Sequence, residues 1–195
     1  MRSDGLRSTK RPSLLLAYLM RHGSTAMSPQ PEGWKQNSLD RIGMQQAVSG
    51  ADFLEQWVRD HPRPCWGISS DLARSEETLA IANAILGGLE IVPPLRDLRA
   101  YEFSQETPAQ YELRSERAFH EVFKMANDKG NIPLIVAHRS TTAFLEKTTP
   151  LLKGESWKPD YRNYSLLLEG GVLGITDRGL VPLFLAIADN WTARA

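Results

Sequence analysis

Apolar runs of strand length alternate with stretches of helical periodicity along most of this chain. Four short runs, each bounded by polar or turn-forming residues, indicate buried strands. Between them, apolar residues recur every three or four positions, as on the buried face of an amphipathic helix. The predicted strands are 14–20, 65–69, 89–92 and 132–137, and the predicted helices are about 40–59, 71–86, 108–126 and 140–152.

The C-terminal part of the chain has the alternation of a further sheet segment. Residues 164–168 and 172–176 are predicted to form a hairpin, followed by an apolar strand near 180–187. Strands that alternate with helices indicate an α/β sandwich with a mainly parallel sheet. Because no repeat or linker interrupts the pattern, we expect one domain over residues 13–195, preceded by a flexible tail at 1–12.

Two of the predicted helices begin with a residue that favours the N-cap position. Asp40 precedes the first helix, and the pair Ser70-Asp71 follows the strand 65–69 at the start of the second. An aspartate at this position accepts a hydrogen bond from a free backbone N–H of the first turn. The apolar faces consist of Ala47, Ala51, Leu54 and Val58 in the first helix, and of Leu72, Leu79, Ala82 and Leu86 in the second.

Length and composition restrict the class of protein. The chain has 195 residues, which suffices for one well-buried domain, and its hydrophobic (42%) and charged (24%) contents are ordinary for a globular protein. Lys+Arg and Asp+Glu number 23 each. This balance argues against a general binder of nucleic acid or membrane surfaces, so we expect neither as a partner.

The single cysteine, Cys65, excludes an intramolecular disulfide and a cysteine-based metal cluster. Its place in an apolar strand predicts a core position. A reducing compartment suits this composition, and we expect a cytoplasmic protein. The apolar run 14–20 is too short to span a bilayer and is followed by no small-residue cleavage site.

Charged residues follow three of the predicted strands directly or within one helical turn. Arg21 and His22 end the first strand, Arg74 lies one turn into the helix after the second, and His138 follows the strand 132–137. In a parallel sheet all three junctions fall at the carboxyl edge, where open α/β sheets bind their ligands. Two imidazoles and two guanidinium groups are therefore predicted to converge there.

Phosphoryl transfer is the chemistry that this set of side chains suits. An arginine presents a planar fork of N–H donors that matches phosphate oxygens in pairs. A neutral imidazole is a competent nucleophile near neutral pH. The helix N-termini that follow each strand add backbone donors, and fixed cations stabilise the charge that develops during the transfer.

The chain resembles the histidine phosphatase superfamily, also called the phosphoglycerate mutase-like family, in four segments that occur in the family's order. The apolar strand before Arg21-His22-Gly23-Ser24-Thr25 is the first of them. The others are Leu39-Asp40-Arg41-Ile42-Gly43-Met44-Gln45-Gln46-Ala47, Ser69-Ser70-Asp71-Leu72-Ala73-Arg74-Ser75-Glu76-Glu77-Thr78-Leu79 and Ile135-Val136-Ala137-His138. The resemblance covers roughly residues 14–145 and implies a three-layer α/β/α sandwich.

The resemblance also implies roles for individual residues. His22 would be the nucleophile that becomes phosphohistidine, and Arg21, Arg74 and His138 would bind the phosphoryl group. The family's proton donor is an acid in an "L-x-E" context, which Leu95-Arg96-Asp97 matches with Asp for Glu; Glu102 is the alternative donor. The family needs no metal ion or other cofactor.

Three departures from the family pattern affect the substrate site. Arg139 stands where the family usually has glycine after its second histidine, and its side chain could add a phosphate contact or crowd the pocket. Ser28 replaces an asparagine often found six residues after the first histidine, and it is a further candidate for phosphate binding. The acid region also lacks the family's glycine-rich "G-x-x-E-G" piece.

The expected function is that of a metal-independent phosphomonoester hydrolase. Its substrate would be a small phosphorylated metabolite or a phosphoprotein. The chain lacks the insertions of the family's mutases, so a phosphatase is favoured over a mutase-type phosphotransferase. A non-catalytic phosphate- or phosphopeptide-binding module on the same scaffold is the alternative from another class, and the sequence contains no signal for an oligomeric state.

Overall fold

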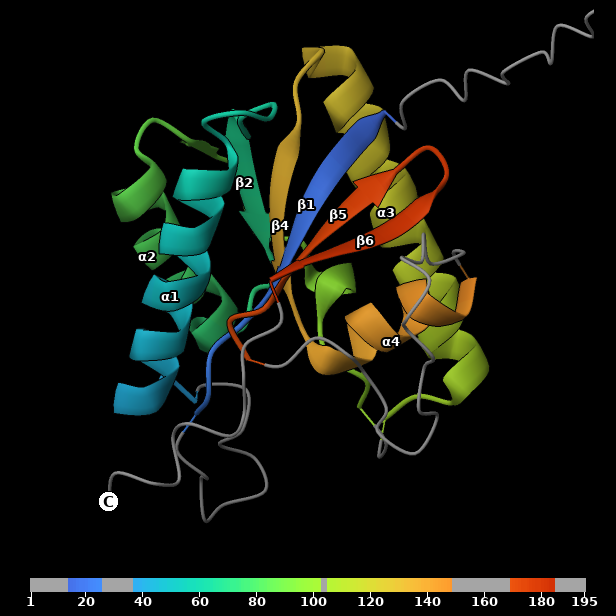
Figure 1. Ribbon diagram of the computed structural model, residues 1–195. Helices are drawn as coiled ribbons and strands as arrows, with labels where there is room; N and C mark the ends of the chain where they lie inside the picture. The colour runs from blue at the N-terminus through green and yellow to red at the C-terminus, as the bar shows by residue number, and fades with distance from the viewer. Residues whose placement is uncertain (1–13, 26–36, 103–104, 149–168, 185–195) are drawn as a thin grey trace, which may run out of the picture.

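The computed structural model describes residues 14–25, 37–102, 105–148 and 169–184. In these ranges a six-stranded sheet lies between two layers of helices (Figure 1). The strands are β1 (Leu15–Arg21), β2 (Trp66–Ser69), β3 (Glu90–Ile91), β4 (Pro133–Ala137), β5 (Val172–Thr176) and β6 (Gly179–Phe184). The helices are α1 (Arg41–Trp57), α2 (Ala73–Leu86), α3 (Pro108–Lys129) and α4 (Arg139–Thr148), with a short 3-10 helix, η2, at Arg96–Leu98.

The strands of the sheet follow the order β3-β2-β4-β1-β5-β6. The first four are parallel to one another, whereas β5 runs antiparallel to both β1 and β6. The predicted three-layer sandwich with a mainly parallel sheet is therefore confirmed. Because β1, β2 and β4 run in the same direction, their carboxyl ends share one edge, the lower edge in Figure 1.

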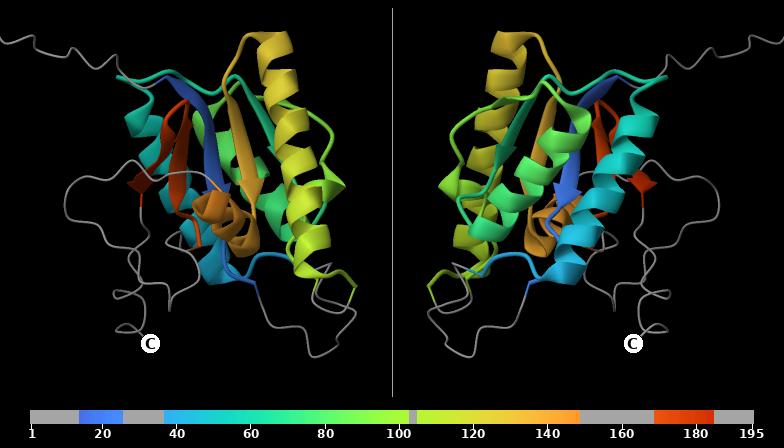
Figure 2. Two further views of the ribbon diagram at one scale, coloured as in Figure 1. Left: turned by 90° about the vertical axis from the view of Figure 1, so that its right-hand side faces the viewer. Right: turned by 90° about the vertical axis from the view of Figure 1, so that its left-hand side faces the viewer.

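Each face of the central strands packs against its own pair of helices (Figure 2). Successive side chains of a strand point to opposite faces. Tyr18 and Met20 of β1 accordingly belong to the cluster formed with α1 and α2, whereas Ala17 and Leu19 pack in the cluster with α3 and α4. Burial on both faces is the reason that the central strands are apolar without a break.

The predicted N-cap of the first helix is confirmed, and that of the second is wrong. The Asp40 carboxylate accepts the backbone N–H of Gly43 at 2.7 Å. α2 instead begins after Leu72, and the Asp71 carboxylate accepts two N–H groups of Arg99, at 2.5 and 2.6 Å. A guanidinium group offers a carboxylate two N–H donors and a positive charge, whereas a helix N-terminus offers this side chain one backbone N–H. The contact with Arg99 therefore determines where the Asp71 side chain lies.

The two C-terminal strands that the structure describes pair with each other, and the predicted hairpin of 164–168 with 172–176 stays a prediction. β5 pairs with β6, which begins at Gly179, one residue before the predicted start of the last strand. The segment 164–168 lies outside the described residues, as does the tail 1–12. Cys65 is exposed rather than buried in the core, because β2 begins one residue after it.

No helix in the part of the chain that the structure describes has both the length and the apolar character needed to cross a bilayer.

Candidate active site

His22 lies immediately after β1, at the carboxyl edge of the sheet. Its backbone N–H donates to the carbonyl of Ala137 at 3.0 Å, which ties it to the end of the neighbouring strand β4. Its ring Nδ1 lies 2.6 Å from the carbonyl oxygen of Gly23. Because a carbonyl oxygen only accepts, Nδ1 carries the proton, and the lone pair of the neutral ring is on Nε2. The Nε–H group of Arg74 donates to this Nε2 at 3.3 Å.

The turn after His22 packs directly against the start of α1. A Cβ atom built on Gly23 would lie 2.1 Å from the carbonyl oxygen of Gly43, and one built on Gly43 would lie 1.9 Å from that of Ser24. Hydrogen bonds to side chains hold the same contact, because the Ser24 hydroxyl donates to the Asp40 carboxylate at 2.8 Å and the Ser24 backbone N–H donates to the Gln46 side chain at 2.8 Å. Two glycines are therefore required for this approach of backbone to backbone.

Replacing Gly43 with alanine is expected to lower the free energy of unfolding by at least about 2 kcal/mol, the cost of forcing atoms into a filled site. Alanine normally stabilises a helix relative to glycine, so the sign of this change is diagnostic. Urea unfolding followed by circular dichroism measures it. Ser49→Ala, on an exposed turn of the same helix, is the control, and stabilisation by Gly43→Ala would contradict the tight contact.

His138 lies directly after β4, beside His22. The two ring centroids are 4.8 Å apart, and the rings meet edge to face. Nε2 of His138 lies 2.6 Å from the hydroxyl oxygen of Ser70 and 3.3 Å from that of Ser75. The ring is almost fully buried, and its Nδ1 has no hydrogen-bond partner among the residues that the structure describes.

Arg21 ends β1 with a buried guanidinium group. Its Nη2 forms a salt bridge with the carboxylate of Glu169, which lies in the turn before β5. The backbone of Arg21 is paired with the same turn, since its N–H donates to the carbonyl of Gly171 at 3.1 Å. Glu169 was missed at the level of sequence because it is 148 residues away and no local pattern marks it.

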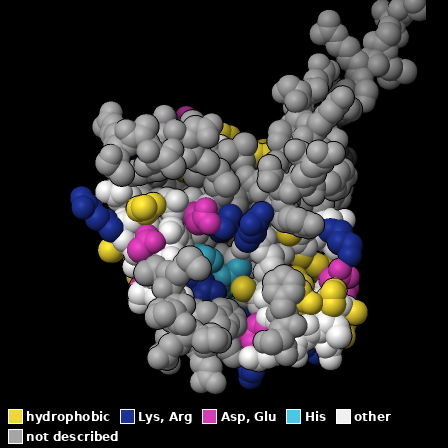
Figure 3. Space-filling view, turned by 90° about the horizontal axis from the view of Figure 1, so that it is seen from below, with side chains coloured by type: hydrophobic (Ala, Val, Ile, Leu, Met, Phe, Trp, Pro, Cys, Tyr) yellow, Lys and Arg dark blue, Asp and Glu magenta, His cyan; other side chains and the backbone are white. Residues whose placement is uncertain are grey.

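A cavity of about 660 Å³ opens at this edge of the sheet. It is lined by His22, Arg74, Ala100, Tyr101, His138, Arg139, Ser140 and Ala143. Figure 3 views the molecule from this side and shows histidine side chains near the centre, with lysine or arginine side chains beside them. The structure thus brings together three of the residues singled out from the sequence, His22, Arg74 and His138, with Arg139 on the same wall.

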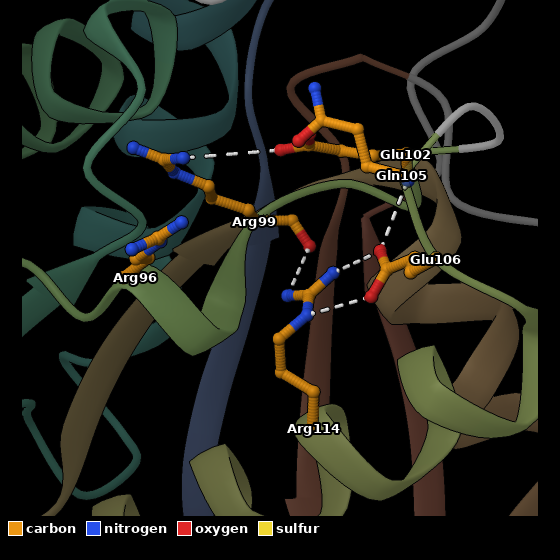
Figure 4. A pocket seen from close by; sticks show the side chains of 6 residues that line it. All are labelled: Arg96, Arg99, Glu102, Gln105, Glu106 and Arg114. Atoms are coloured by element: carbon orange, nitrogen blue, oxygen red, sulfur yellow. Dashed lines mark hydrogen bonds and ion pairs between the residues drawn. The ribbon is translucent and has the colours of Figure 1, made fainter.

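Neither candidate for the proton donor lines this cavity. Asp97 lies in η2, 3.6 Å from the guanidinium group of Arg117. Glu102 lines a separate cavity of about 180 Å³ and lies 3.9 Å from Arg99 (Figure 4). Both roles therefore stay predictions, and so does that of Ser28, which lies outside the described residues.

The backbone between these two acids is held by Arg114 of α3. Its guanidinium group donates to the carbonyls of Asp97, Arg99 and Ala100 at 2.8, 3.1 and 3.3 Å, and to the carboxylate of Glu106 at 2.5 Å. Figure 4 shows the contacts to Arg99 and Glu106. The segment that carries both candidate donors is thus fastened to α3. The spacing of residues in the sequence does not indicate this contact between α3 and the segment before it.

Burial determines the protonation of the cavity side chains. It lowers the pKa of His22 to about 3; the Gly23 hydrogen bond opposes the shift, and the charges of Arg74 and Arg21 add to it. Burial, with the nearby His22 ring and arginines, also lowers the pKa of His138 well below its usual value. The pKa of Arg74 falls to about 10, so its guanidinium group stays charged at neutral pH.

Acid is expected to destabilise the fold through these two imidazoles. Their pKa values in the folded chain lie below that of an unfolded histidine, about 6.5, so the unfolded chain binds more protons as the pH falls below that value. The free energy of unfolding should therefore keep its full value above pH ~6.5 and should fall by roughly a few kcal/mol as the pH is lowered to ~3. His22→Gln should weaken this dependence in urea unfolding measured at several pH values, whereas an unchanged slope would contradict the shift.

The described residues contain no group of three or more histidine, cysteine, aspartate or glutamate side chains that could hold a metal ion.

Comparison with known families assigns the chain to a family. The model of the histidine phosphatase superfamily, branch 1, matches residues 17–143, which is more than half of the chain and includes His22, Arg74 and His138. The chain belongs to the histidine phosphatase superfamily. No curated protein matches its sequence at a significant level.

Solved structures share the histidine phosphatase fold at low sequence identity. Phosphoglycerate mutase of Bacillus anthracis superposes with a TM-score of 0.64 at 16% identity, over 87% of this chain and 92% of the mutase. The candidate phosphohistidine phosphatase SixA of Agrobacterium tumefaciens gives 0.61 at 18%, over 87% and 95%. A mycobacterial glucosyl-3-phosphoglycerate phosphatase gives 0.55 at 19%, over 84% and 90%. At these identities the likeness establishes the fold alone.

Proposed function

We propose that this protein is a metal-independent phosphomonoester hydrolase that works through a phosphohistidine on His22. The observation that carries the proposal is the state of the His22 ring. Nδ1 is engaged by the Gly23 carbonyl, and the lowered pKa keeps the ring neutral, so an unprotonated Nε2 faces Arg74. A nucleophile beside a guanidinium group is the arrangement that phosphoryl transfer requires.

The reaction proceeds in two steps on the same nitrogen. His22 Nε2 attacks the phosphorus of the monoester, an N–P bond forms, the ester P–O bond breaks, and the leaving oxygen takes a proton from Asp97 or Glu102. Water then attacks the phosphohistidine, the N–P bond breaks, the carboxylate takes the proton of the water, and inorganic phosphate leaves. Arg21, Arg74 and His138 stabilise the charge on the transferred group, and Arg139 and Ser28 are further phosphate contacts.

Hydrolysis is favoured over two alternative functions. Relatives of this fold include phosphatases as well as a mutase, and a mutase would pass the phosphoryl group to an acceptor hydroxyl rather than to water. A binding module would hold the phosphate without turnover. The unprotonated Nε2 favours catalysis over binding alone, because a simple phosphate site would gain more from a charged imidazolium.

A phosphoenzyme trap tests the proposal. The protein is mixed with a radiolabelled aryl phosphate in the presence of EDTA, quenched in alkali, and digested for mass spectrometry. We expect label on His22 that is stable to alkali and lost in acid, and steady release of inorganic phosphate. Label without phosphate release would favour a transferase. If neither label nor turnover is found, the non-catalytic binding module would be the remaining function.

The two candidate proton donors separate by their response to the leaving group. An alkyl phosphate needs a proton on its departing oxygen, whereas a nitrophenolate leaves without one. We expect either Asp97→Asn or Glu102→Gln, and not both, to lower kcat for an alkyl phosphate by about 10²-fold or more while sparing kcat for nitrophenyl phosphate. Equal effects on both esters, or no effect in either variant, would exclude a carboxylic donor in this segment.

A further inference from the structure

Two buried serine hydroxyls meet the same nitrogen of His138. Ser70 and Ser75 are both fully buried, and their oxygens lie 2.6 and 3.3 Å from Nε2. Ser70 directly follows β2, and Ser75 lies in the first turn of α2. Among the described residues, neither hydroxyl makes a hydrogen bond to any other group.

The count of hydrogen bonds selects one tautomer of the His138 ring. A proton on Nε2 would leave both hydroxyl hydrogens without an acceptor and would also leave the lone pair of Nδ1 unused. A proton on Nδ1 lets the nearer hydroxyl, that of Ser70, donate to Nε2, and leaves two groups unsatisfied, the Nδ1–H and the hydroxyl hydrogen of Ser75, instead of three. Because a buried polar group without a partner costs about 1–3 kcal/mol, the second arrangement is the stable one.

We propose that Ser70 is a positioning residue that holds His138 as the Nδ1–H tautomer, so that a neutral imidazole donates a hydrogen bond to the phosphoryl group carried by His22. This inference rests on the proposed function. The unsatisfied Nδ1 belongs to a ring whose centroid is 4.8 Å from that of His22, beside the nitrogen to which the phosphoryl group is transferred. The partner that Nδ1–H lacks in the free protein is then an oxygen of the transferred group.

A neutral donor of fixed tautomer suits this cavity. Burial and the arginines lower the pKa of His138, so the ring cannot gain a second proton near neutral pH and donates from one nitrogen only. Without the Ser70 hydroxyl the proton is free to move to Nε2, from which it can reach Ser75 but no longer the position of Nδ1. The serine thus acts on the reaction through His138, without contacting the substrate itself.

The test uses ¹⁵N-labelled full-length protein and long-range ¹H–¹⁵N correlation spectra, with His138→Gln to assign the ring. We expect wild type to show a protonated Nδ1 and an unprotonated Nε2, and the Nδ1 signal to shift on titration with inorganic phosphate. Ser70→Ala should move the proton to Nε2 in a substantial fraction of molecules. It should also lower kcat about 10- to 100-fold with little change in KM, the range for partners that orient a functional imidazole.

Ser75→Ala is the matched control, because it removes an equally buried hydroxyl from the same nitrogen at the longer distance. We expect it to keep the Nδ1–H tautomer and most of kcat. An Nε2–H ring in wild type, an unchanged tautomer in Ser70→Ala, or an Nδ1 signal indifferent to phosphate would overturn the inference. The spectra report on the ring whether or not the protein turns over, so an inactive protein with the expected tautomer and phosphate response would refute the hydrolase alone.

Discussion

Replacing His22 with asparagine is expected to lower kcat/KM for aryl phosphates by at least about 10⁴-fold, the scale on which loss of a catalytic nucleophile is felt. Asparagine keeps the size and polarity of the ring, but its amide nitrogen has no available lone pair. The reaction would lose the Nε2 that lies 3.3 Å from Arg74 Nε, and no phosphoenzyme could form. Phosphate release measured in the presence of EDTA gives the change in rate.

The matched control for this variant is His120→Asn. His120 is exposed on α3 and does not line the cavity that contains His22, so its replacement should leave turnover unchanged. Circular dichroism of both variants checks that the fold is retained. Wild-type turnover by a folded His22→Asn protein would remove the covalent mechanism.

Replacing Arg74 with alanine is the second large effect, with an expected loss of about 10²–10³-fold in kcat, as for other donors that stabilise transition-state charge. Arg74 is buried at the start of α2, lines the cavity, and donates to the nucleophilic nitrogen. Its charge compensates the oxygens of the phosphoryl group as the ester bond breaks. Steady-state kinetics with nitrophenyl phosphate measures the loss without a requirement for the proton donor.

Two further variants define what Arg74 contributes. Arg74→Lys retains the charge but not the planar fork of donors, so it should recover only part of the activity. Arg59→Ala, an exposed arginine just beyond α1, should retain full activity. If Arg74→Ala changed KM alone, the arginine would bind substrate and transition state equally, and its proposed role in the chemical step would be wrong.

Most elements of the fold could be predicted from local patterns. The run that forms β1, the Asp40 cap and the period of α1 are all properties of near neighbours in the chain. The boundary of α2 could not be predicted, because the local sequence favours Asp71 as a cap, whereas in the structure its carboxylate binds the guanidinium group of Arg99 and caps no helix.

The candidate site also contains residues whose position could be predicted from the sequence and residues whose position could not. The convergence of His22, Arg74 and His138 follows from their places after parallel strands, and the structure has them around one cavity. The acids behave differently, since Asp97 and Glu102 each pair with an arginine away from that cavity. The direction of an acidic side chain in an irregular segment depends on the cations that pack nearby, and sequence spacing does not specify those.

By itself the sequence determined which residues end the strands, and therefore that the Arg21 guanidinium group ends β1 and the His22 imidazole follows it at the carboxyl edge. A strand or helix depends on the order of neighbouring side chains, which the chain carries directly. Only the tertiary structure decided the partners: Glu169 for Arg21, and Ser70 for His138 across 68 residues. Such pairs form because buried polar groups must find hydrogen-bond partners wherever the packed elements bring them, at any separation along the chain.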